Sequence, residues 1–94
     1  MTGTARSSDG LDARRRKLLV RSWRRGMREM DLILGGFADA EIETLTDAEI
    51  DQYEELLDIP DTDLLPWLTG ERLPPDEVAS LSIFGRIKSR RTEI

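Results

Sequence analysis

Cysteine and histidine are both absent from this sequence of 94 residues. Their absence excludes disulfides, thiolate nucleophiles, imidazole bases and nearly every structural zinc site. Long apolar runs are missing too, since no stretch approaches the roughly 18 residues that cross a bilayer and none resembles a signal peptide. The acids Asp9 and Asp12 are atypical of a mitochondrial presequence. We therefore expect a protein of the bacterial cytoplasm that does not insert into membranes.

Positive charge is scarce in the middle of the chain. Residues 37–77 carry one Lys/Arg and fourteen Asp/Glu, whereas residues 1–36 carry nine and four, and residues 78–94 carry four and one. The net charge is −5. Because binding to nucleic acid depends on an uncompensated positive field, we do not expect nucleic acid to be a partner.

Apolar residues recur every three or four positions after Asp12, which is the period of a helix with one buried stripe. They are Leu19, Trp23, Met27, Met30, Leu34 and Phe37. Gly26 interrupts this stripe, and a glycine inside a helix costs about 1 kcal/mol. We therefore predict two helices that meet at Gly26, the second of them ending at Gly35 and Gly36.

The second half of the chain has clear signals for helix ends. Thr46 and Glu49 form the capping-box pattern that starts a helix. Asp63 is predicted to cap a short helix that has Pro66 in its first turn and ends at Gly70. One face of a last helix is apolar, with Val78, Leu81, Phe84 and Ile87.

No window alternates apolar and polar residues as a half-buried strand does. The predicted fold is therefore all-α, a compact bundle of four to five short helices in a single domain over residues 12–90. Residues 1–11 are expected to form a disordered N-terminal tail, because they have too few apolar side chains to offset the entropy cost of ordering. Residues 91–94 are expected to form a C-terminal tail.

Catalytic and cofactor-binding motifs are also missing. There is no glycine-rich phosphate loop, and a calcium loop begun at Asp61 would place Leu65 and Pro66 where a ligand and a turn glycine are needed. No spacing singles out a pair of carboxylates for acid–base chemistry. We expect neither an enzyme nor a resident metal or cofactor. The aromatic residues fall on apolar helix stripes and are expected in the core rather than against a flavin: Trp23, Tyr53, Trp67 and Phe84.

Two basic segments each allow two interpretations. The run Arg14–Lys17 lies at a helix start, where the helix dipole disfavours cations, so it is either a solvated face or an electrostatic docking handle. Residues 24–31 hold three arginines, two carboxylates and a glycine. They are either a helix turn with an Arg25–Glu29 ion pair, worth about 0.2–0.5 kcal/mol, or an interface in which Gly26 admits another backbone and the arginines bind carboxylates or carbonyls.

The segment Arg25-Gly26-Met27-Arg28-Glu29 resembles the Arg-Gly-x-x-Glu hallmark of the succinate dehydrogenase FAD assembly (flavinylation) factors of the SdhE type. The resemblance covers residues 14–90 and continues through Leu45-Thr46-Asp47-x-Glu49 and Asp61-x-Asp63-Leu64-Leu65-x-Trp67-Leu68. The partner-binding residues that it implies are Arg25, Gly26, Met27, Arg28, Glu29 and Asp31.

The resemblance implies an assembly factor, or chaperone, that binds the flavoprotein subunit of succinate dehydrogenase and promotes the covalent attachment of FAD to a histidine of that subunit. FAD then belongs to the partner, and this chain needs no cofactor of its own. Apart from the resemblance, we expect the chain to be a monomer. Fumarate reductase, which carries the same covalent flavin, is implied as a second client. The alternatives are a generic helical protein–protein adaptor and an antitoxin-like module with no role in flavinylation.

Overall fold

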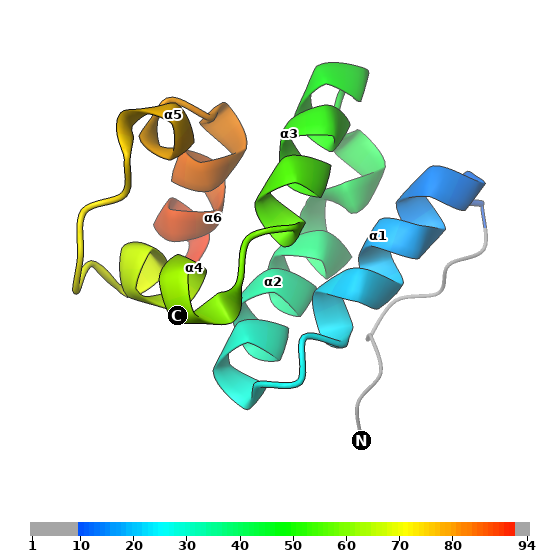
Figure 1. The fold of residues 1–94 in the computed structure, drawn as a ribbon. Helices are drawn as coiled ribbons and strands as arrows, with labels where there is room; N and C mark the ends of the chain where they lie inside the picture. The colour runs from blue at the N-terminus through cyan, green and yellow to red at the C-terminus, as the bar shows by residue number, and fades with distance from the viewer. Residues whose placement is uncertain (1–9, 92–94) are drawn as a thin grey trace. The chain divides into compact units, whose positions relative to one another are not determined.

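The computed structural model describes residues 10–91, which form α-helices, one short 3₁₀ helix and no strand (Figure 1). The elements are α1 (Ala13–Trp23), α2 (Arg28–Glu41), the 3₁₀ helix η1 (Ile42–Thr44), α3 (Asp47–Leu57), α4 (Asp61–Thr69), α5 (Asp76–Ala79) and α6 (Ser82–Arg91). The predicted all-α fold is confirmed, with six α-helices in the described residues where four to five were predicted.

Tertiary contacts divide the chain into two compact units, Met1–Leu45 and Thr46–Ile94. The predicted tails lie mainly outside the described residues, which leave out 1–9 and 92–94. Leu11, in the range predicted as N-terminal tail, is buried. The extent of the domain over residues 12–90 therefore stays a prediction.

The first unit is built on the packing of α1 against α2. α1 begins after Asp12, whose carboxylate accepts a hydrogen bond from the Arg15 backbone N–H at 2.8 Å. The Arg15 guanidinium donates to the carbonyl oxygens of Ile42 at 3.0 Å and Leu45 at 2.5 Å, and so ties α1 to the end of the unit. The buried apolar side chains are Leu11, Leu18, Leu19, Met30, Leu34, Phe37, Ala38, Ile42 and Leu45.

α2 runs through Gly35 and Gly36 to Glu41, so the prediction that these glycines end the helix is wrong. The reason is a contact between helices. The Trp23 ring lies directly on Gly35, where a Cβ atom would stand less than 3.0 Å from three ring atoms. Because glycine has no Cβ, the ring can approach the α2 backbone, and this packing compensates the roughly 1 kcal/mol that glycine costs inside a helix.

The second unit starts with α3, as the capping-box pattern predicts. Thr46 Oγ1 accepts from the Glu49 N–H at 3.2 Å, and Glu49 Oε1 accepts from the Thr46 N–H at 2.9 Å. The second carboxylate oxygen of Glu49 pairs with Arg86 of α6 at 2.6 Å. Glu49 therefore both caps α3 and ties it to α6.

α4 begins before Asp63 and holds Pro66 in its interior, so the prediction that placed this proline in the first turn is wrong. Pro66 has no N–H for the carbonyl of Thr62, one turn earlier. That carbonyl accepts a hydrogen bond from Arg72 Nη2 at 3.3 Å instead. α4 ends at Gly70 as predicted, with φ of 89° and its N–H donated to the Pro66 carbonyl at 3.1 Å.

The last predicted helix is in fact two helices, since α5 ends at Ala79 and α6 begins at Ser82. Gln52 of α3 supplies the local reason, because its Oε1 accepts from Ser82 Oγ at 3.1 Å and from the Ile83 N–H at 3.2 Å. A side-chain acceptor at this place satisfies an N–H that a new helix would otherwise leave unpaired.

The core of the second unit is apolar apart from one tyrosine. Its buried side chains are Ile50, Tyr53, Leu56, Leu57, Leu64, Leu68, Val78, Ile83, Phe84 and Ile87. Of the aromatic residues predicted in the core, Tyr53 and Phe84 are buried, whereas Trp23 in the first unit and Trp67 in α4 are partly exposed.

Candidate functional site

All six predicted partner-binding residues lie in the first unit, at the turn between α1 and α2. α1 ends at Trp23, and the N–H of Arg24 donates to the Arg21 carbonyl at 3.3 Å. The chain then turns, and α2 begins at Arg28 after the extended residue Met27. The predicted break at Gly26 is confirmed.

Gly26 gives the turn its shape. Its φ is +90°, in the left-handed region that side chains rarely adopt. It is exposed, and a Cβ atom built there would meet nothing within 4 Å. The need for glycine is therefore conformational rather than a matter of space, and the backbone of the turn is open to a partner.

Asp31 holds the turn from the first part of α2. Its Oδ1 accepts a hydrogen bond from the Arg25 backbone N–H at 2.8 Å. Its own N–H donates to the Met27 carbonyl at 2.9 Å, so Asp31 is bonded to residues on both sides of Gly26. The side chain is half-buried. Asp31 thus positions the turn, a role that sequence reasoning did not separate from partner contact.

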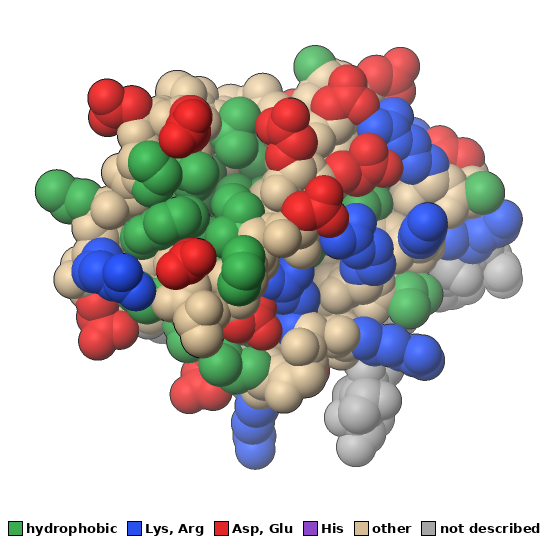
Figure 2. All heavy atoms as spheres, viewed as in Figure 1, with side chains coloured by type: hydrophobic (Ala, Val, Ile, Leu, Met, Phe, Trp, Pro, Cys, Tyr) green, Lys and Arg blue, Asp and Glu red, His purple; other side chains and the backbone are tan. Residues whose placement is uncertain are grey.

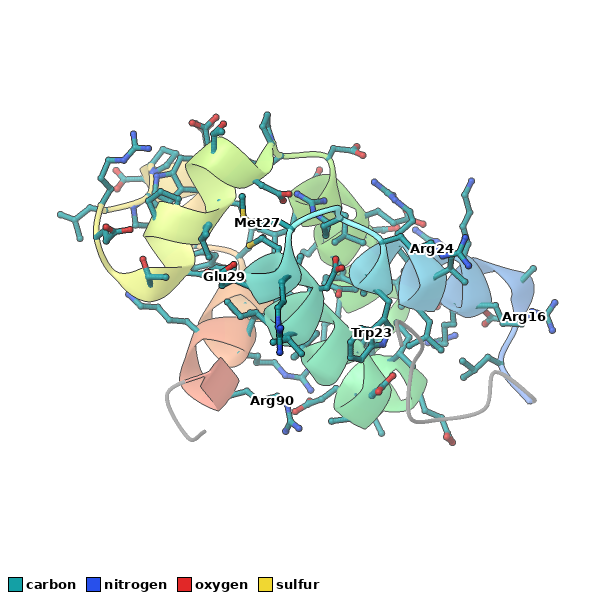
Figure 3. The ribbon with its side chains drawn as sticks, turned by 90° about the horizontal axis from the view of Figure 1, so that it is seen from below. Arg16, Trp23, Arg24, Met27, Glu29 and Arg90 are labelled. Atoms are coloured by element: carbon teal, nitrogen blue, oxygen red, sulfur yellow. The ribbon has the colours of Figure 1, made fainter. Side chains whose placement is uncertain are left out.

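Two charged residues directly after the turn are exposed to solvent. Arg28 and Glu29 are the first residues of α2, and both are exposed. Within the described residues, the Glu29 carboxylate has no hydrogen bond or ion pair. In Figure 3, Met27 and Glu29 lie together at this end of α2. The start of α2 therefore presents an exposed glutamate three residues after a glycine with an exposed backbone.

The interpretation of residues 24–31 as a helix turn with an Arg25–Glu29 pair is wrong. Such a pair requires both residues on one continuous helix, four positions apart. Arg25 lies outside both helices, in the turn that Gly26 shapes. The structure therefore removes the continuous helix that this interpretation requires.

Trp23 anchors the end of α1 on which the turn depends. Its indole Nε1–H donates to Asp39 Oδ1 of α2 at 3.1 Å, and its ring rests on Gly35. Both partners lie well beyond the motif in the sequence, and no spacing identified them. Together they fix the distance between the two helices that the turn connects.

The described residues offer little for a metal or a membrane. They hold no group of three or more acidic side chains placed to bind a metal ion, and none of their helices has the length and apolar character to cross a bilayer. A shallow groove of about 520 Å³ lies in the second unit, and its lining residues are Pro74, Ala79, Phe84, Gly85, Lys88 and Ser89. None of the predicted site residues lines it.

The family model and the individual proteins that resemble this chain point to the same family. Residues 16–91 match the family described as "Flavinator of succinate dehydrogenase". The "FAD assembly factor SdhE" of Acetobacter pasteurianus is 44% identical over 86 residues, which span 90% of this chain and 78% of that protein.

Mitochondrial proteins are similar as well. The "Succinate dehydrogenase assembly factor 2, mitochondrial" of Caenorhabditis briggsae is 32% identical over 83% of this chain and 66% of its own length. The protein of that name from Schizosaccharomyces pombe is 38% identical over 84% of this chain and 57% of its own length. No solved structure is significantly similar to the chain.

Proposed function

The chain belongs to the succinate dehydrogenase flavinator family, and we propose that it is an assembly factor that binds the flavoprotein subunit of succinate dehydrogenase and promotes covalent attachment of FAD to it. The chain is not itself an enzyme in this proposal, and FAD belongs to the partner. It acts as a monomer in the bacterial cytoplasm. A fumarate reductase flavoprotein, with the same covalent flavin, is a further client.

The observation that carries the proposal is the turn between α1 and α2. Gly26 has an exposed backbone, and Glu29, three residues later at the start of α2, has an exposed carboxylate. The half-buried Asp31 holds the turn between α1 and α2 through its bond from the Arg25 N–H. An exposed glycine lets a partner backbone approach closely, and a carboxylate without a partner among residues 10–91 is available to the donors of another protein.

In this proposal the chain acts by positioning the reacting groups of its partner. The reacting atoms, a flavin carbon and a histidine nitrogen, both belong to the flavoprotein, and holding such groups in the reactive geometry can itself supply several kcal/mol of barrier lowering. In this proposal Gly26 and Glu29 contact the flavoprotein near its flavin and favour the domain arrangement in which the bond forms. Arg25, Met27 and Arg28 extend that contact.

The test is co-expression with the flavoprotein subunit in cells that lack their own factor, followed by in-gel flavin fluorescence after denaturation. The native chain should produce a fluorescent flavoprotein band, and Glu29→Ala should not. Glu55→Ala is the matched control, because Glu55 is also an exposed glutamate near one end of a helix, in α3. Equal fluorescence with and without the native chain would refute the proposal.

A further inference from the structure

One face of the first unit is unusually basic. From Ala13 to Arg28 the chain has eight Lys/Arg and no Asp/Glu. Five of these cations are exposed, and four of the five have side chains without a hydrogen bond or ion pair within the described residues: Arg16, Lys17, Arg24 and Arg28. Figure 2 shows Lys and Arg side chains gathered over α1.

The exposed cations of α1 share one side of the helix. At about 100° per residue, Arg16, Lys17 and Val20 fall within one arc, opposite the buried Leu18, Leu19 and Ser22. Val20, between the cations, is 49% exposed. Arg24 follows directly after α1 and leads into the turn at Gly26. We call Arg16, Lys17, Val20 and Arg24 the basic face.

Within residues 10–91, no hydrogen bond or ion pair gives the cations of the basic face a structural role. Neighbouring Arg15 is structural, since it is bonded to Asp12, Ile42 and Leu45. Arg16 and Lys17, in the first turns of α1, have no such partners among residues 10–91. They also lie at the positive end of the helix dipole, which disfavours positive charge. A docking role accounts for their position better than a structural role does.

We propose that the basic face docks an acidic area on the flavoprotein subunit and is continuous with the contact made at Gly26 and Glu29. This inference rests on the proposed function, because it assigns a further surface to the same partner. Charges at the edge of an interface chiefly raise the association rate and its dependence on salt. The basic face steers the partner onto the turn, and Val20 provides an apolar contact between the charges.

A protein partner fits this face better than nucleic acid does. The exposed apolar Val20 lies among the cations, and an apolar side chain there can contact a protein surface but cannot neutralise a phosphate. Residues 46–94 carry twelve Asp/Glu and five Lys/Arg. That excess of negative charge opposes binding of any negatively charged partner, and the repulsion is smaller for an acidic area of limited size on a protein than for a nucleic acid with a charge on every phosphate.

The experiment measures association of the full chain with the isolated flavoprotein subunit. The test variant is Arg16→Glu/Lys17→Glu, and the control is Lys88→Glu/Arg90→Glu on α6, which changes the net charge equally. At about 0.01 M ionic strength the test variant should associate about tenfold more slowly than the native chain, and at about 1 M this difference should shrink to less than about twofold because salt screens the charges. The control should stay within about twofold at both ionic strengths.

Folding is checked in parallel by thermal melting. Glutamate in the first turns of a helix is favourable with respect to the dipole, so the melting temperature of the test variant should not fall. Slower association with an undiminished melting temperature is a result that loss of structure does not produce.

Three results would overturn the inference. The test variant associates as fast as the native chain, or the control slows just as much, or the native chain binds a DNA or RNA oligonucleotide more tightly than the flavoprotein and loses that binding in the test variant. If Glu29→Ala weakens binding and the test variant does not, the proposed function stands and only the basic face is refuted. If the native chain does not bind the flavoprotein, both fail.

Discussion

Replacing Gly35 by alanine should destabilise the protein, although alanine is the better helix former. The new methyl group would meet the flat part of the Trp23 ring, with its carbon less than 3.0 Å from Cδ2, Cε2 and Cε3. These atoms belong to a rigid ring that is also held by its hydrogen bond to Asp39. Either the ring or the whole of α1 has to move.

The magnitude follows from a comparison with Gly36→Ala. Gly36 lies next along α2, and a Cβ atom there meets nothing within 4 Å. Both substitutions gain helix propensity, up to about 1 kcal/mol, so this contribution cancels in the difference. Overpacking costs about 1–3 kcal/mol. We therefore expect the free energy of unfolding of Gly35→Ala to be about 1–3 kcal/mol below that of Gly36→Ala.

Urea unfolding of the two variants and the native chain measures this difference. Gly36→Ala should be slightly more stable than the native chain, and Gly35→Ala less stable. A double-mutant cycle adds Trp23→Leu, which removes the clash, so the loss caused by Gly35→Ala should then shrink markedly. The packing of Trp23 on Gly35 would be refuted if Gly35→Ala were as stable as Gly36→Ala.

Three further predictions concern single side chains. Asp31→Ala should loosen the turn, lower the free energy of unfolding by about 1 kcal/mol and reduce flavin attachment. Asp31→Asn keeps an acceptor for the Arg25 N–H and should recover most of the stability and of the flavin attachment; equal loss of flavin attachment in both variants would mean that the charge contacts the partner. The Thr46 N–H and then Arg86 lower the pKa of the Glu49 carboxyl. The contribution of Glu49 to the free energy of unfolding should therefore be complete above its ordinary pKa and be lost as the pH falls below about 4. When stability is measured against pH in acid, Glu49→Gln should lose less stability than the native chain, and parallel stability curves for the two proteins would count against the prediction. Gln52→Ala should lower the free energy of unfolding by about 1 kcal/mol, because two donors at the start of α6 lose their acceptor; Gln52→Glu should restore it, and unchanged denaturation in Gln52→Ala would exclude this role.

The sequence by itself determined the helical class and those helix ends that depend on local chemistry. Thr46 and Glu49 bond each other across three residues, so their pairing is readable without knowledge of the fold. Gly70 and Gly26 mark places where the backbone needs a positive φ, which glycine adopts without strain. The motif around Gly26 was found for the same reason, because its residues are neighbours in the chain.

The tertiary structure alone decided the places where a distant residue overrides a local preference. Gly35 stays inside α2 because Trp23 covers it. Pro66 stays inside α4 because Arg72 donates to the Thr62 carbonyl, to which Pro66 has no N–H to donate. The hydrogen bond from the Arg25 N–H to Asp31 holds the turn in its shape, and it forms only once the backbone at Gly26 has turned Arg25 toward the start of α2. Local patterns report the energies of adjacent residues, whereas these contacts depend on which backbone atoms folding brings within hydrogen-bonding or van der Waals distance.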